Sequence, residues 1–126
     1  MRLFQAIDNK DTETFLSFLS DDAVFRFGNI PPVEGRENIG QFLDNWFPTI
    51  RSVSHDQIEI WEAEGVKIMN GRVTYTRHDG SKLPVFFSNT FKMKGEKIRE
   101  YFIFVDTSQL YAAFGDAEAE PAAAQH

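Results

Sequence analysis

The sequence predicts an α+β domain in which helices cover a strongly curved antiparallel sheet. Three observations support this fold class. Residues 71–106 contain three alternating segments separated by two turn signals, residues 39–47 carry apolar side chains at helical spacing, and helical segments come before most of the strands. Helices gathered on one face of an antiparallel sheet are typical of the α+β class. We expect the sheet to wrap around the long helix, with the N-terminal helices closing the mouth of the resulting cone.

The alternation in residues 71–106 assigns side chains to the two faces of the predicted sheet. Val73 and Tyr75 share one side of the first segment, and Phe87 and Asn89 share one side of the second. A polar side chain inside such a sheet needs a partner or a ligand. The polar members of this pattern are therefore the first candidates for function.

Two turns and a central strand complete this region. Turns are expected at residues 78–80, which contain an Asp-Gly pair, and at residues 94–96. Six of the nine residues from 98 to 106 are apolar. The third segment is therefore predicted to be a central strand that is buried on both faces for part of its length.

Two short helices are expected before the first strand. The first ends near Asp8, and the second begins after Asp11, which is a good N-cap, and ends at residues 21–22. A strand follows at residues 23–27. It stops before the pair of prolines at residues 31–32, which cannot continue a β-ladder.

The longest helix is expected after Gly35 and is ended by Pro48. A strand is predicted at residues 54–63 and a shorter one at residues 66–69, which a turn at residues 70–71 follows. The apolar positions of the helix recur at i, i+3, i+4, i+7 and i+8, at Ile39, Phe42, Leu43, Trp46 and Phe47.

Length and composition limit the kind of protein. The chain has 126 residues, 13 of them phenylalanine, no cysteine and a formal net charge of −6. This length suits one domain, predicted over residues 1–114, and the small polar residues 115–126 predict a disordered tail. The negative charge argues against nucleic-acid binding. The chain contains no apolar run that would cross a membrane or form a signal peptide, so we expect a cytoplasmic protein.

The order of these motifs resembles the SnoaL-like branch of the NTF2-like superfamily over residues 1–112. The motifs are the Gly-Arg-Glu helix start at residues 35–37, the Asp-Gly hairpin at residues 79–80, and the last strand, which ends in Asp106. The resemblance implies a cone-shaped α+β barrel with a pocket between the long helix and the concave sheet. It also implies a homodimer formed through the sheet.

The resemblance does not choose an activity, because this superfamily includes enzymes and binding proteins. Ketosteroid isomerases place a tyrosine on an early helix, and this chain has none before Tyr75. Epoxide hydrolases use an Arg-x-Asp pair on a central strand. Here the pair at residues 77–79 lies at a turn, and Ile103 takes the place of the last acid. SnoaL-type polyketide cyclases use a pocket acid, and the resemblance places Asp106 at that position.

Three residues are candidates for acid/base chemistry. Asp106 follows a run of apolar residues, so it is either a pocket acid or the cap of a helical turn at residues 107–114. His55 is the best proton carrier among the three histidines, the alternative being a structural role, and its neighbour Asp56 points the other way along the strand. Tyr75 is a candidate to polarise a carbonyl oxygen.

Further residues are candidates to contact a ligand, each with a structural alternative as a core, turn or surface residue. Neither metal-ligand spacing nor a cofactor motif is visible, so no metal or cofactor is implied. We expect a small apolar or aromatic, carbonyl-bearing ligand. The protein is then either a cofactor-free enzyme for isomerisation, cyclisation or dehydration, or a non-catalytic binding or dimerisation module. The ligand-binding candidates are Tyr101, Asn89, Phe87, Trp46, Phe42, Arg26 and Asn29.

Overall fold

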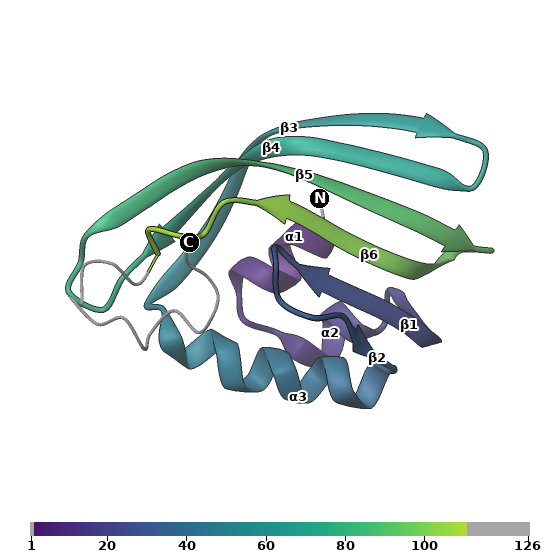
Figure 1. The fold of residues 1–126 in the computed structure, drawn as a ribbon, viewed down its shortest axis with the longest axis horizontal. Coiled ribbons are helices and arrows are strands. Elements are labelled where there is room, and N and C mark those ends of the chain that lie inside the picture. The colour runs from purple at the N-terminus through teal and green to yellow at the C-terminus, as the bar shows by residue number, and fades with distance from the viewer. Residues whose placement is uncertain (1, 111–126) are drawn as a thin grey trace.

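The structure, a computed structural model, describes residues 2–110 and contains a six-stranded sheet with helices on its concave side (Figure 1). The elements in chain order are α1 (Arg2–Asp8), α2 (Thr12–Leu16), β1 (Leu19–Phe27), β2 (Val33–Glu34), α3 (Arg36–Trp46), the 3₁₀ helix η1 (Phe47–Thr49), β3 (Ser52–Ala63), β4 (Val66–Thr76), β5 (Lys82–Lys94) and β6 (Lys97–Val105).

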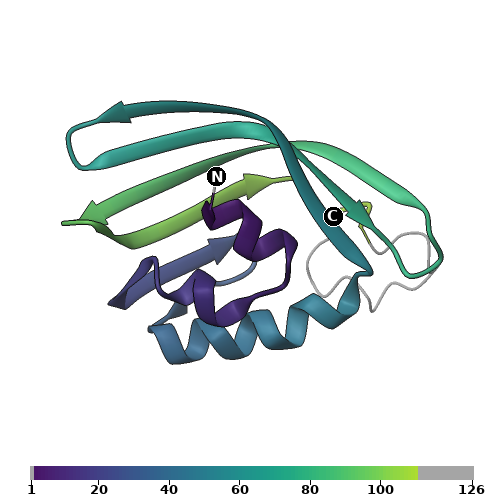
Figure 2. The same cartoon turned by 180° about the vertical axis from the view of Figure 1, so that it is seen from behind.

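The sheet is strongly curved and has the strand order β2-β1-β6-β5-β4-β3. Figures 1 and 2 show β3 to β6 arching over α1, α2 and α3, which confirms the predicted α+β cone. The sheet is mixed rather than wholly antiparallel, because β1 and β6 pair in parallel. This pairing arises because the last strand returns to the middle of the sheet beside the first one, and α3 lies within the connection between them.

The second helix is shorter than predicted. Asp11 caps α2 by accepting a hydrogen bond from the Thr14 backbone N–H at 3.2 Å, as expected, but α2 ends at Leu16. Beyond it the Phe18 carbonyl accepts a hydrogen bond from the Ile98 N–H at 2.9 Å. Pairing with β6 therefore takes over where the local sequence favours helix, and β1 begins at Leu19 instead of residue 23.

The predicted turn at residues 70–71 is wrong, because β4 runs through it without interruption. Gly71 pairs with Phe87 on one side and lies against a bulge in β3 on the other, where Gln57 has a φ of +58°. A Cβ at position 71 would lie 2.7 Å from Ile58 Cδ1 and 3.1 Å from the Asp56 carbonyl oxygen. Glycine is needed here for the close approach of two strands and not for a turn.

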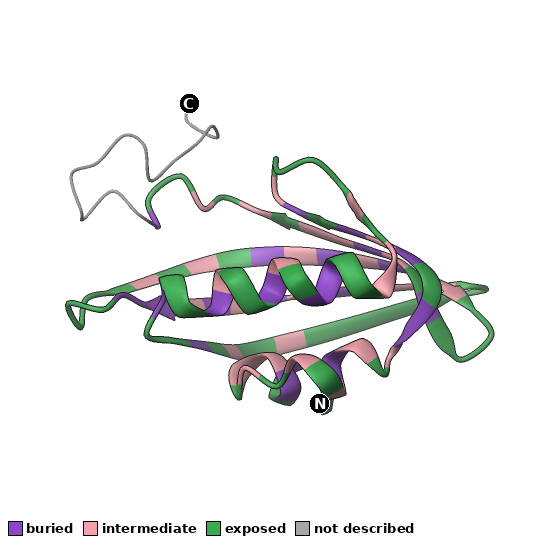
Figure 3. Ribbon diagram, turned by 90° about the horizontal axis from the view of Figure 1, so that it is seen from below, coloured by how far each residue is buried: buried purple, intermediate pink, exposed green. Residues whose placement is uncertain are grey.

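The helix α3 covers one side of the cone with an apolar face. Ile39, Leu43 and the following Phe47 are buried, and Figure 3 shows the buried side of α3 turned toward the sheet. Phe27 packs edge-on against Trp46, with ring centroids 5.2 Å apart. The many phenylalanines therefore form an aromatic core between α3, β1 and the concave face of the sheet.

The strand β6 is interior, as predicted, but its fully buried side chains lie on the concave side only, within one chain. The Tyr101 side chain is fully buried, whereas Phe104 on the convex side is 54% exposed. Residues 107–110 form a turn that Arg77 holds by donating to the carbonyl oxygens of Gln109 and Leu110 at 2.7 and 2.8 Å. The rest of the helical turn predicted at 107–114, and the predicted tail, lie outside the described residues.

No helix in the described part of the chain is both long enough and apolar enough to span a membrane.

Replacing Gly71 with alanine is expected to lower the free energy of unfolding by about 1–3 kcal/mol, because the added methyl group meets the backbone of the β3 bulge. Urea denaturation followed by circular dichroism measures this change. Thr74→Ala on the same strand is the control and is expected to cost less. Equal stability of Gly71→Ala and the wild type would contradict the close approach at the bulge.

Candidate functional site

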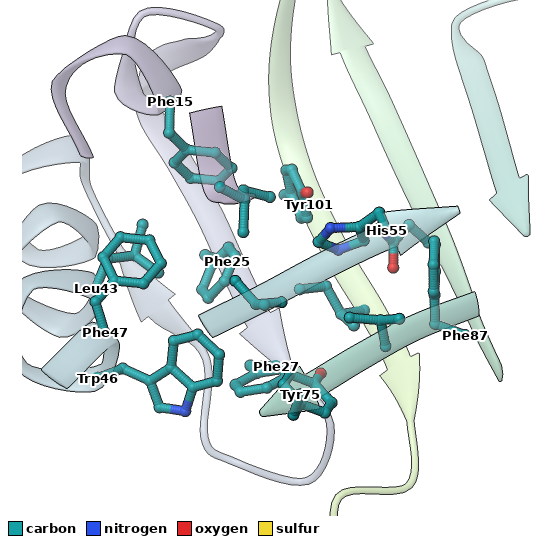
Figure 4. Close-up of a pocket in the computed structure, with 15 residues that line it drawn as sticks. Phe15, Phe25, Phe27, Leu43, Trp46, Phe47, His55, Tyr75, Phe87 and Tyr101 are labelled. Atoms are coloured by element: carbon teal, nitrogen blue, oxygen red, sulfur yellow. The ribbon is translucent and has the colours of Figure 1, made fainter. Parts of the chain in front are cut away.

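An apolar cavity lies inside the cone, between the N-terminal helices, α3, β1 and the concave face of β3 to β6. Figure 4 shows its aromatic walls, to which β1 contributes Phe25 and Phe27 and the end of α3 contributes Trp46. Four polar or titratable side chains enter this lining: His55, Tyr75, Asn89 and Tyr101. A largely apolar pocket with a few converging polar groups is the usual form of a small-molecule site.

The cavity has a volume of about 40 Å³. A volume of ~10–15 Å³ by this measure holds one water molecule, so the space suits a few waters or a very small ligand. A ring-sized ligand does not fit this volume unless side chains of the cavity wall move.

His55 is held by a carboxylate from the first helix. Its Nδ1 lies 2.6 Å from Asp8 Oδ1, and its backbone N–H donates to Asp8 Oδ2 at 3.2 Å. The ring stacks on Phe4 at a centroid distance of 4.5 Å and meets the edge of Phe87 at 5.5 Å. The His55 side chain is 10% exposed and that of Asp8 is 27% exposed. Two rings and one carboxylate thus fix the imidazole at the cavity wall.

This arrangement determines which nitrogen of His55 is available for chemistry. An ionised carboxylate only accepts hydrogen bonds, so Asp8 requires the proton to be on Nδ1. The neutral ring then carries its lone pair on Nε2, which has no hydrogen-bond partner among residues 2–110. A histidine oriented by a carboxylate in this way can take up a proton, and the carboxylate stabilises the resulting imidazolium.

Tyr101 and Asn89 line the same cavity, and each carries an unsatisfied polar atom. The Tyr101 hydroxyl and Asn89 Oδ1 are both buried and have no hydrogen-bond partner within the described structure. Burial, followed by the proximity of Tyr75, raises the pKa of Tyr101 far above its ordinary value. The Tyr101 hydroxyl is therefore neutral at physiological pH, where it can donate a hydrogen bond.

The cavity contains six of the residues that the sequence singled out. His55 and Tyr75 are present among the three catalytic candidates. Tyr75 is 3% exposed and lies edge-on to Trp46, with a centroid distance of 6.1 Å. The ligand-binding candidates that line the cavity are Tyr101, Asn89, Phe87 and Trp46.

The other four candidates lie outside the described lining of this cavity. Asp106 is exposed and accepts a hydrogen bond from the Ser108 N–H at 2.9 Å, so it caps the turn after β6. Arg26 is exposed and its guanidinium lies 4.9 Å from the centre of the Phe102 ring. Asn29 is exposed in the turn after β1. Phe42 is half-buried, and its ring centroid lies 5.8 Å from that of Phe25.

Asp8 is the candidate site residue that sequence reasoning missed. Asp56, the acid next to His55 in the chain, pairs with Arg72 at 2.7 Å, in agreement with its predicted outward direction. The partner of His55 comes instead from α1, 47 positions earlier. One local signal was present, since an acidic residue at the C-terminal end of a helix is unfavourable for the helix dipole. Such a local conflict is typical of functional positions.

Within residues 2–110 no group of three or more histidine, aspartate or glutamate side chains is placed to hold a metal ion.

Replacing Tyr101 with phenylalanine is expected to leave the stability unchanged or to raise it by about 1 kcal/mol, because the buried hydroxyl has no protein partner to lose. Thermal unfolding of the ligand-free protein tests this. A loss of more than about 1 kcal/mol would show that the Tyr101 hydroxyl is hydrogen-bonded in the ligand-free protein, and would contradict its lack of a partner.

Comparison with known proteins identifies the family. The model of the SnoaL-like domain matches residues 1–101, which is most of the chain, whereas no protein with a curated description matches it. Three solved structures superpose with a TM-score of 0.79. A candidate polyketide cyclase from Xanthomonas campestris is 16% identical, with 87% of this chain and 89% of that chain covered.

The second is an NTF2-like protein of unknown function from Burkholderia pseudomallei, which is 14% identical, with 87% of this chain and 89% of that chain covered. The third, from Catenulispora acidiphila, has a ketosteroid isomerase-like fold and is in complex with trimethylamine; it is 14% identical, with 89% and 88% covered. Identities this low show a shared fold only. Together with the family match, they show that the chain belongs to the SnoaL-like family and has the NTF2-like cone fold.

Proposed function

We propose that this protein binds a small apolar or aromatic carbonyl compound in its cone and catalyses cofactor-free proton transfer beside the carbonyl group. One observation carries the proposal: the 2.6 Å contact between His55 Nδ1 and Asp8 Oδ1 at the wall of an apolar cavity. A histidine whose tautomer is fixed by a carboxylate is a suitable general base near neutral pH.

In the proposed step, His55 Nε2 takes a proton from the carbon next to the carbonyl group. The C–H electron pair forms a carbon–carbon double bond, and the carbonyl π electrons move to oxygen to give an enolate. The neutral Tyr101 hydroxyl, with Tyr75 nearby, donates a hydrogen bond to that oxygen. In a β,γ-unsaturated ketone, return of the proton from Nε2 to the γ-carbon completes an isomerisation. In a ligand with a second carbonyl group, the enolate carbon attacks that group, and the alkoxide that forms takes the proton from Nε2, which completes a cyclisation.

The similar structures are consistent with this class of function. One is described as a candidate polyketide cyclase, and another has a ketosteroid isomerase-like fold and a small bound molecule. The proposed base, His55, is one of the two proton carriers expected from the sequence. Its partner Asp8 was not expected, and the other expected proton carrier, Asp106, lies at the surface.

The alternative is a non-catalytic module that binds the same ligands and dimerises through its sheet. The exposed apolar residues of the convex face favour dimerisation, with exposed fractions of 74% for Phe86, 54% for Phe104 and 52% for Trp61. Phe86 and Phe104 line a groove together with Asn70, whose buried Oδ1 has no partner in the described chain. We propose that a second copy of the chain covers this face.

Wild-type protein is expected to exchange the α-protons of acetophenone or phenylacetone with D₂O, and His55→Gln is expected to slow this exchange at least about a hundredfold. Asp8→Asn should give an intermediate rate, since an amide still accepts from Nδ1 but does not stabilise the imidazolium charge. Proton NMR follows the exchange.

His78→Asn is the matched control, because His78 is exposed and bonds the Pro48 carbonyl oxygen outside the cavity. Its exchange rate should equal that of the wild type. Unchanged exchange in a folded His55→Gln protein would contradict the role of His55. Binding of the ketones without any exchange by the wild type would favour the non-catalytic module.

Charged substitutions at the convex face are expected to separate the proposed dimer. Phe86→Glu and Phe104→Glu should shift the protein from dimer to monomer in sedimentation velocity, because they place charges where apolar surface meets apolar surface. Ile30→Glu, which changes an exposed apolar residue in the loop after β1, is the control and should remain dimeric. A wild-type protein that is already monomeric would overturn this proposal.

A further inference from the structure

Two residues of the cavity wall carry a buried polar atom without a partner, and these atoms indicate which chemical group a ligand presents there. We propose that the cavity selects ligands bearing a neutral hydroxyl group, a phenol or an enol, which donates its hydrogen bond to Asn89 Oδ1 and accepts one from the Tyr101 hydroxyl. This inference rests on the proposed function, because it concerns the ligand of the same cavity, and it specifies which form of that ligand is bound best.

The sheet register places these two side chains together. Asn89 on β5 pairs with Ile103 on β6, and Tyr101 lies two residues before Ile103 on the same concave face. Diagonal neighbours of this kind on adjacent strands have Cα atoms ~7–8 Å apart, within reach of one small group held between the longer side chains. Both residues line the cavity, with exposed fractions of 2% for Asn89 and 0% for Tyr101.

Neither atom has a partner in the described protein, and burial without a partner is costly. A polar atom removed from water without a hydrogen bond costs ~1–3 kcal/mol. Asn89 sits among aromatic side chains and Tyr101 packs against Phe91 with a centroid distance of 4.4 Å, so apolar residues at both positions would fit the surroundings better. The retention of two such atoms in one cavity therefore points to a group that enters from outside.

The hydrogen-bonding capacity of these atoms limits that group. Asn89 Oδ1 can only accept, so the ligand must supply an O–H or N–H donor to satisfy it. The neutral Tyr101 hydroxyl donates, so the ligand must also supply an acceptor. A hydroxyl group does both with one oxygen atom, whereas a ketone or an ether satisfies Tyr101 and leaves Asn89 unpaired.

The preference concerns the neutral forms of the ligand. The enol tautomer of a carbonyl compound carries a hydroxyl group where the keto tautomer carries only an acceptor, so the enol is expected to bind more tightly than the ketone. The enolate of the proposed proton transfer has no hydroxyl proton, and it is paired by the Tyr101 hydroxyl alone.

Three probes of similar size separate the hydrogen bonds. Phenol donates and accepts, anisole only accepts, and toluene does neither. Titration of the wild-type protein, followed by NMR chemical shifts, should give a dissociation constant for phenol about tenfold below that for anisole, since one buried acceptor is left unpaired by anisole. Toluene should bind no more tightly than anisole.

Two variants assign the preference to its atoms. Asn89→Leu should abolish the preference for phenol over anisole while leaving toluene binding in place. Tyr101→Phe should weaken phenol and anisole together and leave toluene unaffected. Ser88→Ala, the neighbour of Asn89 on the opposite face of β5, is the control and should keep the wild-type order of affinities.

The outcomes distinguish this inference from the function on which it rests. Equal binding of phenol and anisole by the wild type would show that a cavity water already satisfies Asn89, and would overturn the hydroxyl preference while the ligand site stands. Equal weakening of all three probes in Asn89→Leu would indicate a packing role and would also overturn it. Failure of all three probes to bind would overturn both the preference and the ligand site.

Discussion

The contact between Asp8 and His55 is the interaction on which the site depends, because it joins the first helix to the sheet and orients the imidazole at once. Both oxygens of the carboxylate are used, one on the ring and one on the backbone N–H of β3. Phe4, on the same helix, covers the ring of His55. If α1 moved away from the sheet, His55 would lose both the Asp8 carboxylate that fixes its tautomer and the Phe4 ring that covers it. The mouth of the cone and the proposed base are therefore one structural unit.

Much of the fold follows from short-range patterns in the sequence. The alternation of residues in β5 fixes which side chains face the cavity, and the helical spacing in α3 fixes its buried face. The errors occur where pairing with another strand overrides a local preference. The second helix ends early because the chain pairs with β6, and Gly71 continues a strand because it meets a bulge in β3. β6 is far away in the sequence, and the bulge belongs to the preceding strand, so the residues around each boundary do not reveal it.

In the candidate site, too, the residues placed by short-range patterns were predicted, and those placed by tertiary packing were not. The polar residues on the concave faces of β4, β5 and β6 were identified because alternation determines their direction once the core face is known. Asp8 was missed because the docking of a short terminal helix depends on tertiary packing. Asp106 was found by its position in the last strand, yet its own sequence neighbours favoured a cap, and its contact with Ser108 is of that kind. Local capping chemistry was the better guide there than the family pattern.

The parallel pairing of β1 with β6 has a consequence for the synthesis of the chain. β1 is made early, but its neighbour in the sheet is among the last described residues to leave the ribosome. Until β6 has been synthesised, the aromatic side chains of β1 cannot pack within the complete sheet. The pairing of β1 with β6 joins segments that are separated by most of the domain. Folds dominated by such distant contacts form slowly, because loop closure comes before the contacts that stabilise it. Premature termination within β6 would thus leave an exposed aromatic strand, a substrate for chaperones or for aggregation.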